Sequence, residues 1–105
     1  VYGYQMEVDH RPERNWSGGI YDEARRGWLY PVDLNPAAKR AYRWGEWNQY
    51  RIECIGTTIR TWVNDIPVSY LVDDASLKGL IGLQVHAVYE PEDEGKKTYW
   101  RNIRI

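Results

Sequence analysis

The strongest structural signal in this chain is a β-hairpin in its second half. Residues 58–63 and residues 66–71 both read as strands, and only Asn64 and Asp65 separate them. A two-residue connection of this kind joins antiparallel strands through a primed turn, and asparagine tolerates the left-handed backbone that such a turn requires. The sequence therefore predicts antiparallel β-structure here.

Further strands are predicted wherever apolar and polar residues alternate, because successive side chains of a strand point to opposite faces. No long helical pattern is present, and residues 90–97 form a charged, solvated loop. We interpret residues 25–47 as a long loop with a helical turn at 37–41, since their pattern is irregular. The all-β sandwich predicted by this pattern has its other strands at residues 2–8, 20–24, 48–55, 79–88 and 99–105.

The composition limits the classes of partner. A formal net charge of -1 provides no field for attracting nucleic acid or an anionic membrane. No apolar run reaches the roughly 18 residues of a membrane span, and residues 1–105 contain no basic-then-apolar segment typical of a signal peptide. The aromatic residues are six Trp and nine Tyr without Phe, a composition suited both to sugar-stacking surfaces and to a sandwich core. Cys54 is the single cysteine, and its apolar neighbours predict a buried structural thiol.

We treat residues 1–105 as a single domain. A chain of this length with long loops buries a thin core, and it begins directly in strand-like alternation. The expectation is therefore that additional N-terminal strands of the same domain complete the two sheets.

Six blocks, taken in chain order, resemble one known family, the 3-keto-disaccharide hydrolase domain, which includes 3-keto-glucoside 1,2-lyases and 3-keto-2-hydroxyglucal hydratases. This resemblance implies a jelly-roll β-sandwich of the concanavalin or laminin-G type, incomplete at its N-terminal side, and a periplasmic or secreted location. The blocks are GYQMEVD (3–9), SGGIYDEA (17–24), GEWNQYRIECIG (45–56), IRTWVND (59–65), GLIGLQVH (79–86) and WRNIRI (100–105).

The resemblance also implies an enzyme acting on glycosides that carry a ketone at C3. The ketone acidifies the proton on C2, so a side-chain base can remove it, and the glycosidic oxygen on C1 then leaves. The expected activity is elimination across C1–C2, hydration of the 3-keto-2-hydroxyglucal that forms, or both. The alternative is a non-catalytic, lectin-like carbohydrate-binding module, and a laminin-G-like protein-interaction domain is a third interpretation.

Three residues are the catalytic candidates. His86 ends the LQVH block, where an imidazole can act as acid, base or metal ligand, although a strand-end histidine bound to a carbonyl is the structural alternative. Glu7 lies in a row of polar side chains that is also typical of a solvated outer face. Glu23 follows a run of small residues, and its structural alternative is a surface ion pair with Arg25 or Arg26.

The substrate-binding candidates are polar or aromatic residues near these three. Alternation places two of them on the face of Glu7 and one on the face of His86. Aromatic residues beside the long loops are the candidate stacking platforms: Trp16, Tyr21, Trp28 and Tyr30. The substrate-binding set is Gln5, Asp9, Tyr21, Trp28 and Gln84.

A divalent metal is the one cofactor that the resemblance admits, with His86 as its candidate ligand. The other histidine, His10, is distant in sequence, and neither an HxH motif nor a Cys/His cluster is present. The residues alone leave the metal unassigned.

Overall fold

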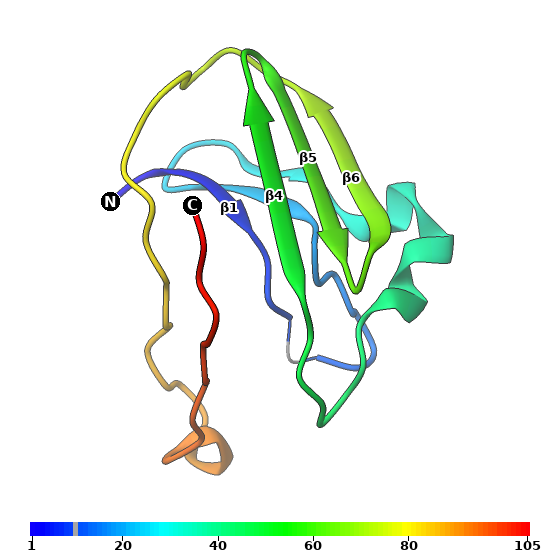
Figure 1. Cartoon of the computed structure of the whole chain (residues 1–105). Helices are drawn as coiled ribbons and strands as arrows, with labels where there is room; N and C mark the ends of the chain where they lie inside the picture. Colours follow the sequence, from blue (N-terminus) through cyan, green and yellow to red (C-terminus); the bar gives the residue numbers. More distant parts are fainter. Residues whose placement is uncertain (10) are drawn as a thin grey trace.

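The computed structural model describes residues 1–9 and 11–105, and its main elements are two three-stranded antiparallel sheets (Figure 1). This nearly all-β architecture agrees with the predicted β-sandwich, while the jelly-roll connectivity stays a prediction. The first sheet is formed by β1 (Gly3–Met6), β2 (Ile20–Glu23) and β3 (Gly27–Tyr30), in that order. The second is formed by β4 (Tyr50–Ile55), β5 (Thr58–Val63) and β6 (Ile66–Val72). Three short 3-10 helices accompany them: η1 (Val32–Leu34), η2 (Pro36–Ala41) and η3 (Pro91–Asp93). None of the helices in the described part of the chain has the length and apolar character of a membrane span.

The predicted hairpin is confirmed. β5 and β6 pair antiparallel, and both turn residues have positive φ, 50° at Asn64 and 64° at Asp65. The Asn64 side chain also holds the turn in place, because its amide donates to the carbonyl of Ala41 at 2.7 Å and its oxygen accepts the N–H of Gln49 at 2.9 Å. The turn is thereby fixed against η2 and the residue before β4.

The two sheets meet at Gly18, two residues before the start of β2. Its carbonyl oxygen accepts two buried hydrogen bonds, from Thr61 Oγ1 on β5 at 2.6 Å and from Ser69 Oγ on β6 at 2.8 Å. Gly18 has φ +90°, and a Cβ there would lie 2.9 Å from Val63 Cγ2 and 3.0 Å from Val68 Cβ. Only glycine allows this close approach.

The apolar core is small and lies where η1 and η2 cover the second sheet. Partly buried aromatic residues and Met6 pack against it and extend it toward β1. Its buried members are Val32, Ala38, Ala41, Val63 and Val68.

A second set of polar contacts ties the first sheet to the end of β6. Asp22 is fully buried and binds Arg25 Nε at 2.7 Å and Arg26 Nε at 2.5 Å. Arg26 also binds Asp73 at 2.8 Å, and the Tyr4 hydroxyl donates to the same carboxylate. Burial opposes ionisation of Asp22, but the two guanidinium groups outweigh it and lower its pKa. The network is therefore complete at neutral pH.

Several sequence predictions need correction. Residues 27–30 form strand β3 rather than a loop, because positive φ at Ala24 (55°) and Gly27 (76°) reverses the chain tightly enough to pair them with β2. Cys54 is exposed rather than buried. Its side chain shares the inner face of β4 with Ile52, and that face is only partly covered.

The strands predicted at residues 79–88 and 99–105 are also wrong. Both segments run extended outside the two sheets, without backbone pairing among the described residues (Figure 1). Their apolar side chains remain exposed, Val85 at 74% and Ile103 at 62%. Alternation shows which side chains share a face, but a strand also needs a neighbouring strand with which to pair.

We expect Gly18→Ala to lower the free energy of unfolding by roughly 2–4 kcal/mol, because the added methyl meets two valines and the backbone there is left-handed. Chemical denaturation measures this. Gly79→Ala is the control, since a Cβ at Gly79 meets nothing within 4 Å and should change stability by less than about 0.5 kcal/mol. Equal stability of the two variants would contradict the proposed junction.

Candidate functional site

The candidate site begins with a row of side chains across the first sheet. Gln5 pairs with Tyr21 across β1 and β2, and Tyr21 pairs with Trp28 across β2 and β3. Residues directly opposite in neighbouring strands share a face, and the opposite face carries the buried Ile20 and Asp22. The row therefore faces away from the core. The rings of Tyr21 and Trp28 lie 5.1 Å apart, edge to face.

Glu7 continues this row beyond the end of β1. Its N–H donates to the carbonyl of Gly19, and its own carbonyl accepts the N–H of Gly18, both at 2.9 Å. One carboxylate oxygen accepts Gln5 Nε2 at 2.9 Å, and the other accepts Arg14 Nη2 at 3.1 Å. Both oxygens are thus held in place.

Burial is the largest influence on the Glu7 carboxyl and raises its pKa above the ordinary value of 4.5. The positive charge of Arg14 acts in the opposite direction, and His86 adds a smaller attraction of the same sign. Glu7 and His86, 79 positions apart in the chain, both line the same hollow, in which His86 is exposed.

One broad, open hollow is lined by about half of the chain, including nearly all the residues predicted from the sequence. It lies between the first sheet, the inner face of β4 and the two extended segments 77–89 and 96–105. Arg14, Tyr42 and Tyr50 line it as well. The predicted residues that line it are Gln5, Glu7, Tyr21, Glu23, Trp28, Gln84 and His86.

Asp9 has a different environment from the one predicted for a substrate contact. It is fully buried, and its carboxylate accepts hydrogen bonds from Arg14 Nε at 2.6 Å, Trp16 N at 2.9 Å and Arg11 N at 3.1 Å. Burial opposes its ionisation, but these donors prevail and lower its pKa. Asp9 is a charged anchor beneath the site, and Arg14 is the side chain that it presents to the hollow.

Sequence reasoning missed Arg14. Its guanidinium carbon lies 5.1 Å from the ring centre of Trp16 and 5.2 Å from that of Trp28, within cation–π range of both. The two indoles pack edge to face at 4.6 Å. Arg14 lies in a loop without periodicity, so only its neighbours Asp9 and Trp16 could have indicated a role for it.

Glu23 lines the hollow but lies at its other end. It pairs with Gly3, four residues before Glu7, and at about 3.3 Å per residue this places the Cα atoms of the two glutamates about 13 Å apart along β1. They cannot act on the same sugar carbon. The ion pairs considered for this segment are made by Asp22 instead.

Among the described residues, the candidate metal ligands do not form a cluster. In the described part of the chain, no group of three or more His, Cys, Asp or Glu side chains could hold a metal ion. His10, the other histidine considered from the sequence, lies outside the described residues. The described donor set therefore does not fit a metal held by protein ligands alone.

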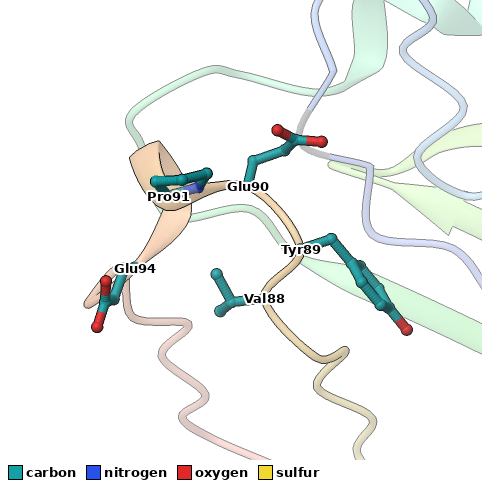
Figure 2. A pocket seen from close by; sticks show the side chains of 5 residues that line it. All are labelled: Val88, Tyr89, Glu90, Pro91 and Glu94. Carbon is teal, nitrogen blue, oxygen red and sulfur yellow. The ribbon is translucent and has the colours of Figure 1, made fainter.

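A smaller surface pocket lies beside η3, away from these residues. Its lining comprises Val88, Tyr89, Glu90, Pro91 and Glu94 (Figure 2). The carboxylates of Glu90 and Glu94 point in different directions and do not converge on a common point (Figure 2). This pocket contains none of the candidate site residues.

Two antiparallel sheets, with a row of polar and aromatic side chains that faces an open hollow, define a small β-protein. Over residues 1–105 the chain matches the family described as the 3-keto-alpha-glucoside-1,2-lyase-like domain. The chain belongs to this family, as its sequence blocks indicated. No curated protein matches it.

The raised pKa of Glu7 has a consequence for stability. The native state binds this proton more tightly than the unfolded chain, so the stabilisation is complete below pH 4.5 and is lost as the pH rises through the native pKa. We expect Glu7→Gln to remove this decrease in stability with rising pH. The free energy of unfolding of both proteins, measured by urea unfolding at a series of pH values, would show this. A carboxyl NMR titration that placed Glu7 at or below 4.5 would contradict the assignment.

Proposed function

We propose that this domain cleaves 3-keto-glycosides by elimination across C1–C2, and that it can hydrate the 3-keto-2-hydroxyglucal released. The observation that carries the proposal is Glu7, a partly buried carboxylate with a raised pKa, which lines the same hollow as His86 and a row of sugar-binding side-chain types. A base whose pKa lies closer to the working pH is more effective in proton transfer.

Glu7 is the base in this mechanism. Its carboxylate takes the proton from C2, and the electron pair of that bond forms the enolate across C2 and C3. When the enolate collapses, the C3 carbonyl returns, a C1–C2 double bond forms and the bond from C1 to the glycosidic oxygen breaks. Protonated His86 donates a proton to that leaving oxygen. Hydration adds water to C1 and returns a proton to C2.

The row on the first sheet holds the sugar. Trp28 and Tyr21 offer aromatic surface for stacking, and the buried side-chain oxygen of Gln5 finds no hydrogen-bond partner among the described residues. A sugar hydroxyl would satisfy that acceptor. Gln84 is a further hydroxyl contact. Glu23, because of its distance from Glu7, serves the leaving-group side of the substrate.

The second candidate function is a non-catalytic lectin-like module that uses the same face. The open hollow and the paired rings of Tyr21 and Trp28 favour it, since both suit binding of an intact glycan without turnover. This alternative gives Glu7 and His86 only hydrogen-bonding roles.

The test compares 3-keto-trehalose with trehalose, using the full chain, with and without a chelator. We expect turnover of the keto sugar only, reduced about 10²–10⁴-fold in Glu7→Gln and in His86→Ala. Glu53→Gln is the matched control, because Glu53 pairs with Arg51 on the outer face of β4. The chelator arm tests the divalent metal that the family resemblance implies.

Binding of trehalose without turnover of either sugar would identify the lectin-like module and reject the catalytic roles. Equal activity in Glu7→Gln and wild type would reject Glu7 as the base while leaving the reaction itself in place.

A further inference from the structure

We infer that Arg14 is a catalytic residue of the proposed elimination, in which its guanidinium stabilises the enolate oxygen that forms at C3. The inference rests on the proposed function and adds the electrophilic group that the reaction needs. Negative charge accumulates on the C3 oxygen when the C2 proton leaves. Stabilisation of such developing charge by a preorganised hydrogen-bond donor is usually the largest single contribution to lowering the barrier.

Arg14 is fixed before substrate arrives. Asp9, fully buried and ionised, accepts its Nε at 2.6 Å and is itself held by the backbone N–H groups of Trp16 and Arg11. The indoles of Trp16 and Trp28 flank the guanidinium. An arginine anchored in this way does not have to reorganise during the reaction.

The Arg14 guanidinium also has N–H groups that make no hydrogen bond within the described part of the chain. Its described hydrogen bonds use Nε toward Asp9 and one hydrogen of Nη2 toward Glu7, so Nη1 and the second Nη2 hydrogen are unengaged among the described residues. The side chain is 26% exposed and lines the hollow. These donors are available to a substrate oxygen.

The contact with Glu7 explains how charge moves through the step. Arg14 Nη2 lies 3.1 Å from one oxygen of the base that takes the C2 proton. As the proton reaches Glu7, its negative charge disappears and an equal charge appears on the C3 oxygen, attached to the neighbouring carbon. Arg14 stands beside both positions, so its charge has a partner before and after proton transfer.

The experiment isolates proton removal from bond cleavage. The probe is the 3-keto derivative of 1,5-anhydroglucitol, which has an acidic C2 proton but no glycosidic leaving group. Exchange of that proton in D2O is followed by NMR across a pH series, beside turnover of 3-keto-trehalose. The proteins are wild type, Arg14→Lys, Arg14→Gln and the control Arg60→Gln, whose side chain stacks on Tyr70 on the outer face.

We expect Arg14→Gln to slow exchange about 10²–10³-fold at every pH. Arg14→Lys, which keeps the charge but loses the planar fork, should slow it about tenfold, and Arg60→Gln should match wild type. If Arg14→Gln does not fold, Arg14→Lys carries the test, and wild-type exchange in that variant overturns the inference.

Two further results would also overturn it. Recovery of the Arg14→Gln rate at higher pH would mean that Arg14 only keeps Glu7 ionised. If the wild-type protein eliminates 3-keto-trehalose but does not exchange the C2 proton of the probe, the reaction does not form a stabilised enolate and the inference is wrong. If the wild-type protein is inactive in both assays, the proposed function and this inference are both rejected.

Discussion

The architecture of the site depends on one buried carboxylate. Asp9 has no exposed surface, and an ionised group in that position must be satisfied by the groups around it. It binds the side chain of Arg14 and the backbone of Arg11 and Trp16, and Ser17 Oγ accepts its N–H at 3.0 Å. The loop from β1 to β2 consequently closes around Asp9. That closure delivers Gly18 to the second sheet and Arg14 to the hollow.

The same closure links stability to chemistry. Gly18 accepts the hydroxyls of Thr61 and Ser69, so the loop that carries the guanidinium also joins the two sheets. Glu7 is held through its backbone by Gly18 and Gly19, next to this junction. Its partial burial raises its pKa, which supports its proposed role as a base. A change that loosens the junction should therefore affect both stability and proton transfer.

Local patterns predicted part of this arrangement. The hairpin at Asn64 and Asp65 followed from turn chemistry, and the placement of Gln5 and Glu7 on one face followed from alternation. Contacts between distant residues could not be read in the same way: the burial of Asp9 and the position of Arg14 arise from a loop without periodicity. The alternation of residues 79–88 predicted a strand, but the structure offers that segment no pairing partner. The expectation of N-terminal strands that complete the sheets stays a prediction.

The most direct test of the proposed active site is a crystal structure of the Glu7→Gln variant of the full chain with 3-keto-trehalose bound. We expect the keto sugar to lie against Tyr21 and Trp28, with C2 facing residue 7. The C3 oxygen should lie within hydrogen-bond distance of Arg14, and His86 should lie beside the glycosidic oxygen. A sugar bound elsewhere, or bound on this face with C2 directed away from residue 7, would contradict the assignment of this hollow as the active site.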